Sequence, residues 1–225
     1  MLQRELEPEA MDTAEEAEAY DTMDHGGVNQ VFVQDLLAAR AVRPIESTDR
    51  LRVLDIGSGP AGIPVILCET APACTIMAVD LAQHMLRAAQ RHVAAAGLTD
   101  RIFLQRASVG ALPFPNGSFD IVMSNSLIHH LPEPAIAFPE MRRVLRPGGM
   151  MFVRDLIRPD SDESVEELTQ KHVGHETEVQ RALFSASLRA SLTLAELQEL
   201  LDNVPLKAAS LRQTSDRHWT LVGTR

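Results

Sequence analysis

Residues 53–62 read VLDIGSGPAG, and the apolar segment 76–79, which reads IMAV, is followed directly by Asp80. The first stretch is typical of a buried strand that runs into a glycine turn, and the second of a strand that ends in a carboxylate. A doubly wound sheet places such strands side by side and holds a nucleoside over their carboxyl ends. The two stretches therefore predict an α/β fold that binds a nucleoside.

Around this motif the apolar pattern alternates between strand and helix periods. The expected strands are residues 51–56, 75–79, 101–105, 119–124 and 150–153, and the expected helices are residues 60–69, 83–96 and 135–145. Pro147-Gly148-Gly149 is expected to end the last of these helices. Alternation of this kind implies a doubly wound, Rossmann-like parallel sheet with right-handed crossovers.

The flanking segments have other patterns. Residues 1–19 carry seven acidic residues against one base, Arg4, and are expected to form a flexible acidic tail or a loosely attached helix. Residues 20–225 are expected to form one domain. It would start with a lid and helix over 20–40, carry a helical cap over 158–203, and end in an antiparallel hairpin over 206–211 and 218–222.

Composition excludes several classes of partner. With 225 residues, 45% of them hydrophobic, the chain suits one globular domain, and its formal charge of −10 opposes binding to nucleic acid or anionic lipid. No apolar stretch approaches the roughly 18 residues of a membrane span, and the first residues lack the pattern of a secretory signal. The two cysteines lack metal-ligand spacing. We therefore expect a cytoplasmic protein without membrane insertion and without a nucleic-acid partner.

The residues around the glycine turn indicate which nucleoside compound the protein binds. Gly57, Gly59 and Gly62 match the spacing of dinucleotide-binding folds, which is a weak signal by itself. Asp55 stands two residues before the first glycine, where its carboxylate would repel a pyrophosphate and attract an ammonium and a sulfonium. S-adenosyl-L-methionine carries both cations. The glycines would let the backbone approach the methionine moiety, and Asp80 could accept the ribose hydroxyls.

Three alternatives stay open at this point. The glycines could make only a tight turn, with Asp80 as a helix cap. The same pattern could belong to an NAD(P)-dependent oxidoreductase, although Asp55 argues against a diphosphate. The chain could also be a non-catalytic module that binds the cofactor without turnover.

The chain resembles the class I S-adenosylmethionine-dependent methyltransferases, and among them the ubiquinone/menaquinone C-methyltransferase-like group that acts on small molecules. The resemblance covers about residues 51–153. Its motifs are VLDIGSG at 53–59, AVDL at 78–81, ALPF at 111–114, SFDIV at 118–122, HHL at 129–131 and VLRPGG at 144–149. It implies S-adenosyl-L-methionine as cofactor, a seven-stranded sheet with an antiparallel last strand, and a small-molecule methyl acceptor.

The resemblance also implies roles for individual residues. Asp55, Gly57, Ser58 and Gly59 would hold the methionine moiety, Asp80 the ribose, and Asn125 and Ser126 the region of the methyl group. The family often has an acidic residue after the third strand for the adenine, but this chain has Arg106-Ala107-Ser108 there. The adenine would therefore be contacted by Leu81, Ser108 and the backbone at Ala107.

The transfer itself requires little from the protein, because a sulfonium methyl group is already activated and needs mainly a positioned acceptor in a dry pocket. A base is required for a neutral hydroxyl, an ammonium or a weak carbon acid. His129 and His130 closely follow the fourth predicted strand and are candidate bases, although either could instead pack on the following helix.

A lid is expected over residues 20–25, immediately before the first predicted helix. Its Tyr20 and His25, together with Asn29 on the first helical turn, could close over the cofactor and the acceptor, with His25 as a third candidate base. The alternative is a polar approach to a helix without a role in binding.

Two further groups of polar residues are weaker indications of a binding site. Arg154-Asp155 and Arg158 follow the fifth predicted strand, where they could hold a polar acceptor or form structural ion pairs. His172, His175 and Glu176 are metal-ligand types, but Gly174 interrupts their helix and no third His or Cys stands nearby. We therefore predict no metal ligands from the sequence.

Overall fold

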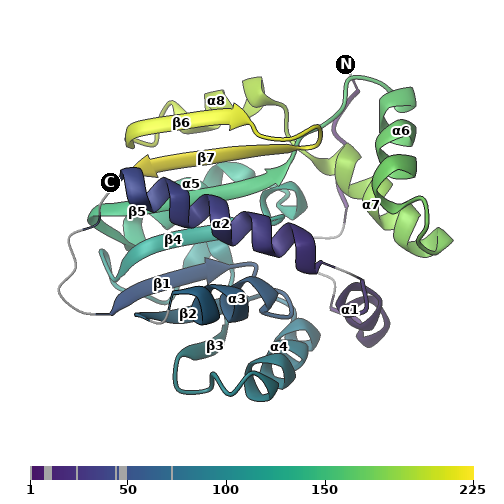
Figure 1. Ribbon diagram of the computed structural model, residues 1–225. Coiled ribbons are helices and arrows are strands. Elements are labelled where there is room, and N and C mark those ends of the chain that lie inside the picture. Colours follow the sequence, from purple (N-terminus) through teal and green to yellow (C-terminus); the bar gives the residue numbers. More distant parts are fainter. Residues whose placement is uncertain (1, 8–11, 24, 44, 46–49, 72) are drawn as a thin grey trace.

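The computed structural model describes residues 2–7, 12–23, 25–43, 45, 50–71 and 73–225, and it contains one seven-stranded sheet (Figure 1). The strands lie in the order β3-β2-β1-β4-β5-β7-β6. Their bounds are Leu51–Ile56 (β1), Cys74–Asp80 (β2), Ile102–Arg106 (β3), Phe119–Asn125 (β4), Leu145–Leu156 (β5), Lys207–Gln213 (β6) and His218–Thr224 (β7). β1 to β5 pair in parallel, whereas β7 is antiparallel to both β5 and β6. The predicted mostly parallel sheet with an antiparallel C-terminal hairpin is confirmed.

Helices cover both faces of this sheet. The longer helices are Ala14–Asp21 (α1), Gly26–Val42 (α2), Gly62–Thr70 (α3), Gln83–Ala95 (α4), Ala137–Val144 (α5), Asp162–Val173 (α6), Glu178–Ala190 (α7) and Leu194–Leu201 (α8). In the described part of the chain, no helix has the length and apolar character that crossing a bilayer requires.

Alternating side chains of the strands build two separate cores. Val53 of β1 packs with residues of α2, α3 and α4 on one face, such as Phe32 and Leu67. Leu54, its neighbour in sequence, packs with residues of α5 and α8 on the other face, such as Phe138. Successive residues of a strand point to opposite faces, so an apolar run without polar alternation is what a strand buried on both faces requires.

The strand order creates a crevice at the end of β1. β1 pairs with β2 on one side and with β4 on the other, so the chain leaves β1 toward opposite halves of the sheet. At such a switch point the connections diverge and leave an opening above the carboxyl ends of the strands. The glycine turn that follows Ile56 lies at this opening.

The prediction for residues 145–149 is wrong in one respect. α5 ends at Val144, and β5 begins at Leu145 and includes Pro147-Gly148-Gly149, which was expected only to end the helix. Leu145 pairs with Phe119, and the register then shifts before Ile121 pairs with Met150. A Cβ on Gly149 would lie 2.8 Å from the Asp120 carbonyl oxygen, so glycine permits this irregular start of the strand.

The N-terminal segment, predicted as a flexible tail, is packed against the cap where the structure describes it. The Arg4 side chain donates hydrogen bonds to the carbonyl oxygens of Ala190 (2.6 Å), His129 (2.9 Å) and Leu131 (2.9 Å). The Glu5 N–H donates to the Arg189 carbonyl at 3.2 Å. Residues 2–7 therefore lie beside α7, and α1 follows from Ala14 (Figure 1). Residues 1 and 8–11 of the predicted tail lie outside the described residues.

Candidate active site

A cavity of about 960 Å³ opens at the carboxyl ends of β1, β2 and β4. Its other walls come from the segment between α1 and α2, from α6 and α7 of the cap, and from the β6–β7 turn. All of the predicted site residues line this cavity, namely Tyr20, His25, Asn29, Asp55, Gly57, Ser58, Gly59, Asp80, Leu81, Ala107, Ser108, Asn125, Ser126, His129 and His130.

Asp55 lies at the end of β1 beneath the glycine turn and is 2% exposed. Its Oδ2 accepts a hydrogen bond from Ser58 Oγ at 2.7 Å. Burial raises the pKa of Asp55 to about 7, because desolvation of the carboxylate outweighs the hydrogen bond from Ser58. A cation placed beside Asp55 would favour its charged form.

Gly57 has a left-handed conformation with φ 71°. A Cβ at this position would lie 2.9 Å from Leu127 Cδ1, which is closer than packed carbon atoms approach. Both the backbone angle and the lack of space therefore require glycine at the start of the turn.

Asp80 at the end of β2 holds the turn in place. Its Oδ2 accepts a hydrogen bond from the Gly59 N–H at 2.8 Å, and its Oδ1 accepts one from the Ala82 N–H at 2.9 Å. Burial raises the pKa of Asp80 above its usual value, and the backbone hydrogen bonds oppose this shift. A carboxylate oxygen has further lone pairs, so each oxygen can also accept a ligand hydroxyl.

The end of β4 contributes a strained residue. Ser126 has φ 55°, a left-handed conformation that is uncommon for a residue with a side chain, and its N–H donates to the Arg154 carbonyl at 2.9 Å. Such backbone strain is often found at functional sites. After β3, Ser108 Oγ accepts a hydrogen bond from the Gly110 N–H at 3.3 Å, and its hydroxyl proton can be donated to another partner.

The predicted lid residues lie over the glycine turn. The rings of Tyr20 and His25 are stacked with their centroids 4.4 Å apart, and burial raises the pKa of Tyr20 to about 12. A Cβ on Gly59 would lie 3.9 Å from Tyr20 Cε1, and one on Gly62 would lie 2.8 Å from Asn29 Nδ2. These contacts place the N-terminal side of the cavity directly against the turn. Asp24, between the two rings in sequence, lies outside the described residues.

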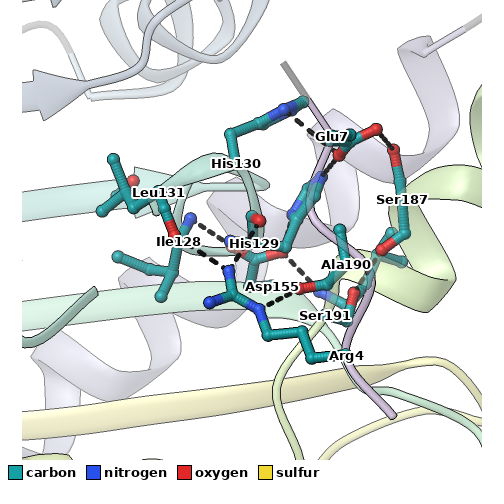
Figure 2. Close-up of polar contacts among 12 residues, drawn as sticks. Arg4, Glu7, Ile128, His129, His130, Leu131, Asp155, Ser187, Ala190 and Ser191 are labelled. Carbon is teal, nitrogen blue, oxygen red and sulfur yellow. Dashed lines mark hydrogen bonds and ion pairs between the residues drawn. The ribbon is translucent and has the colours of Figure 1, made fainter. Parts of the chain in front are cut away.

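His129 lies in a buried polar cluster (Figure 2). Its Nδ1 is 2.5 Å from Asp155 Oδ1, and its side chain is 3% exposed. The Asp155 carboxylate also accepts hydrogen bonds from the backbone N–H groups of Ile128 (2.5 Å), His129 (3.2 Å) and Leu156 (2.6 Å). Burial alone would lower the pKa of His129, but the Asp155 and Glu7 carboxylates raise it above its usual value.

Glu7 completes this cluster from the N-terminal segment. Its Oε1 lies 3.3 Å from His129 Nε2 and 3.2 Å from His130 Nδ1, whereas its Oε2 accepts a hydrogen bond from Ser187 Oγ at 3.2 Å. Figure 2 shows the two imidazoles pointing toward the same carboxylate. The sequence contains no local signal for Glu7, because only the fold brings residue 7 to residues 129 and 130.

Arg154 near the end of β5 and Arg158 just after β5 both form ion pairs with side chains of other elements. Arg154 lines the cavity, but its Nη2 is 2.5 Å from Asp35 Oδ2 and its guanidinium lies over the Phe32 ring at 5.7 Å. Arg158 lies outside this cavity, and its Nη2 donates to Glu196 at 2.6 Å. Structural ion pairs, the alternative left open by the sequence, are therefore present at both positions.

Arg217 on the cap side was not singled out by the sequence. It lines the cavity, its guanidinium lies 5.7 Å above the Phe184 ring, and its buried Nη1 makes no hydrogen bond to any described residue. The neighbouring Asp216 is occupied by Lys171 at 2.8 Å and by His172 at 2.9 Å. A buried guanidinium N–H without a hydrogen-bond acceptor destabilises the folded state. An oxygen atom of a ligand that accepted a hydrogen bond from Arg217 would remove this destabilisation.

A mostly parallel sheet with a glycine turn and two carboxylates at adjacent strand ends is typical of doubly wound folds that bind nucleosides. Residues 54–153 match the family described as "Methyltransferase domain". The match nearly coincides with the span over which the sequence resembles that family.

Individual relatives agree with this assignment. The chain is 37% identical over 108 residues to demethylmenaquinone methyltransferase from Thermus thermophilus. The match covers 48% of each chain. It is 32% identical over 123 residues to 27-O-demethylrifamycin SV methyltransferase from Amycolatopsis mediterranei, which covers 55% of this chain and 44% of the relative. The chain thus spans about half the length of the curated relatives it matches.

The fold is also that of a solved methyltransferase. A SAM-dependent methyltransferase from Aquifex aeolicus has a TM-score of 0.68 to this chain, with 15% sequence identity, and the match covers 94% of this chain and 97% of that one. The predicted doubly wound, mostly parallel seven-stranded fold is therefore confirmed over nearly the whole chain.

Proposed function

We propose that this protein transfers the methyl group of S-adenosyl-L-methionine to a small-molecule acceptor held between the sheet and the cap. The observation that carries the proposal is the pair of carboxylates, Asp55 and Asp80, on either side of the glycine turn in a methyltransferase domain. Both face one cavity of about 960 Å³, which has room for a nucleoside and a second molecule.

The residues at the turn fit the chemical groups of this cofactor. Asp55 offers a buried carboxylate for the ammonium group, and Asp80 offers two oxygens for a ribose diol. Asp55, Gly57, Ser58 and Gly59 would hold the methionine moiety, whereas Leu81, Ala107 and Ser108 would contact the adenine. When bound, the cofactor supplies a methyl group that its sulfonium has already activated.

The chain's own residues would position the acceptor and exclude water. Asn125 and Ser126 lie at the end of β4 and line the cavity. Tyr20 and Asn29 cover the turn from the N-terminal side, as the predicted lid requires. Holding the acceptor oxygen or carbon close to the methyl carbon in a dry cavity supplies most of the rate enhancement for such a displacement.

A proton has to leave when the acceptor is a neutral hydroxyl. The predicted bases His25, His129 and His130 all line the cavity. His129 presents both ring nitrogens to carboxylates, so we assign it the role of positioning the cluster around Glu7. His130, whose Nδ1 lies 3.2 Å from Glu7 Oε1, and His25, whose Nε2 lies 3.2 Å from the Tyr20 carbonyl oxygen, are the two imidazoles that we propose contact the acceptor.

For the acceptor we propose a hydroxylated aromatic or quinol-like molecule. The names of the two relatives given above refer to a quinone precursor and to a rifamycin hydroxyl. Leu183 and Phe184 provide an apolar wall, and the Arg217 guanidinium provides donors for an oxygen of such a ring. The formal charge of −10 supports a partner other than nucleic acid, and we place the reaction in the cytoplasm.

The test is formation of S-adenosylhomocysteine by the full chain with S-adenosyl-L-methionine and a panel of hydroquinones, phenols, thiols and amines. We expect turnover with at least one hydroquinone or phenol and much slower turnover in Arg217→Ala. Tight cofactor binding without turnover on any compound of the panel would favour the non-catalytic alternative. Turnover restricted to thiols or amines would contradict the proposed acceptor class.

A further inference from the structure

We propose that Glu7, His129 and His130 form a binding site for a divalent transition-metal ion, with Zn²⁺ as the ion that fits best. The ligand atoms are Glu7 Oε1, His129 Nε2 and His130 Nδ1, and they all lie within 4.8 Å of one another. Two imidazoles and one carboxylate are a ligand set of catalytic zinc sites.

The distances in the cluster suit ligands of one ion better than hydrogen bonds. Glu7 Oε1 lies 3.3 Å from His129 Nε2 and 3.2 Å from His130 Nδ1. Charge-assisted N–H···O bonds are shorter, at about 2.7–2.9 Å. Two ligands bound tetrahedrally to one zinc ion, each about 2.0–2.1 Å from it, are about 3.3 Å apart. Glu7 Oε1 is moreover a buried oxygen that accepts no hydrogen bond from any described residue.

Neighbouring groups already hold the proposed ligands in orientation. Asp155 accepts from His129 Nδ1 at 2.5 Å, which directs the Nε2 lone pair toward Glu7 when the imidazole is neutral. Asp155 is itself held by backbone N–H groups, and Glu7 Oε2 is held by Ser187 Oγ. A carboxylate behind a ligating histidine is the usual arrangement in zinc proteins.

Charge and position also favour a cation. The cluster buries the carboxylates of Glu7 and Asp155, with side chains 8% and 1% exposed, and Arg4 directs its hydrogen bonds to backbone carbonyl oxygens. A metal ion held by the two neutral imidazoles would supply positive charge beside these carboxylates. His129 and His130 line the cavity, so a fourth coordination position would face the acceptor.

This inference rests on the proposed function only for its consequence. An ion at this site would bind the acceptor hydroxyl directly and lower its pKa, so that its proton would pass to solvent. The acceptor oxygen would then form a bond to the methyl carbon as the carbon–sulfur bond breaks and S-adenosylhomocysteine leaves. The ion would then replace a histidine base in the proposed reaction. Binding of the ion itself can be measured without any turnover.

The experiment is a titration of the chelator-treated full chain with Zn²⁺ by calorimetry and with Co²⁺ by visible absorption. We expect one equivalent of each ion and the intense bands of tetrahedral Co²⁺. Glu7→Gln should weaken binding by more than about 100-fold, and Asp155→Asn by about 10- to 100-fold. The control is Glu176→Gln, because Glu176 also lies 3.3 Å from one histidine nitrogen, that of His175, but outside the cluster.

Binding of S-adenosylhomocysteine in the same samples shows whether each variant is folded. If Glu7→Gln fails to bind it, His130→Asn provides the same test from the other side of the cluster. Absence of Zn²⁺ binding by the wild-type chain, or equal loss in Glu176→Gln, overturns the metal site. Such a result with intact S-adenosylhomocysteine binding leaves the proposed function standing, whereas loss of that binding in the wild type contradicts the proposed function instead.

Discussion

The two halves of the cavity are built from the chain in different ways. In the half formed by β1 and β2, the connecting hydrogen bonds join residues close in sequence, with Ser58 three residues from Asp55 and Gly59 21 residues from Asp80. In the half formed by the N-terminal segment and the cap, Arg4 bonds to Ala190 across 186 residues and to His129 across 125. The first half is encoded in a short motif, whereas the second exists only after the whole chain has folded.

The largest effect is expected from Gly57→Ala in the locally encoded half. Its φ of 71° and the 2.9 Å approach of a Cβ to Leu127 add a backbone penalty of about 1–2 kcal/mol to an overpacking penalty of about 1–3 kcal/mol. Gly97→Ala is the matched control, because Gly97 has φ 67° and nothing within 4 Å of its Cβ position. Thermal unfolding should show a much larger loss of stability for Gly57→Ala, and equal losses would contradict the close approach.

Asp80→Ala should leave the fold intact and weaken cofactor binding by about 100-fold, which is about 2.7 kcal/mol. The substitution removes the proposed ribose ligand and frees the N–H groups of Gly59 and Ala82. Asp100→Ala serves as control, because Asp100 is exposed in the turn before β3. Unchanged calorimetric affinity for S-adenosyl-L-methionine in Asp80→Ala would show that the assignment of Asp80 is wrong.

The comparison of the two halves also explains what could be predicted from the sequence. Strand periodicity and the glycine turn depend on neighbouring residues, so the pairing of β1 with β2 and the positions of Asp55 and Asp80 followed from the motif. Glu7 and Arg217 carry no local pattern, and the acidic residues 1–19 indicated a solvated tail. The start of β5 was misplaced because Pro147-Gly148-Gly149 usually ends a helix, and only pairing with β4 makes it part of a strand.

Arg4→Ala tests the half that depends on distant contacts. It removes hydrogen bonds to three carbonyl oxygens, and we expect a stability loss of about 2 kcal/mol together with a higher KM for the acceptor. The Kd of the cofactor should stay unchanged, because Arg4 lies away from the glycine turn. Arg87→Ala, which alters an exposed arginine of α4, is the control. If Arg4→Ala raised the Kd of the cofactor by the same factor as the KM of the acceptor, the two halves of the cavity would be coupled.

A smaller effect on the affinity for the cofactor is expected from a change of pH. The folded protein raises the pKa of Asp55 to about 7 by burial, so the carboxyl is mostly protonated below that pH, while a cationic ligand binds the charged form. Affinity for the cofactor should therefore rise with pH up to about 7 and level off above it, with a slope of up to about tenfold per unit below it. Calorimetry between about pH 5.5 and about pH 8.5, which brackets this pKa, measures the slope. The slope should disappear in Asp55→Asn, and a slope that persists there would assign the titration to another group.

The most direct test of the central claim is a calorimetric titration of the wild-type chain with S-adenosylhomocysteine and, separately, with NADH at a pH above 7. Carboxylates at the ends of β1 and β2 should give one site for S-adenosylhomocysteine and no detectable heat from NADH. Saturable binding of NADH without binding of S-adenosylhomocysteine would contradict the account.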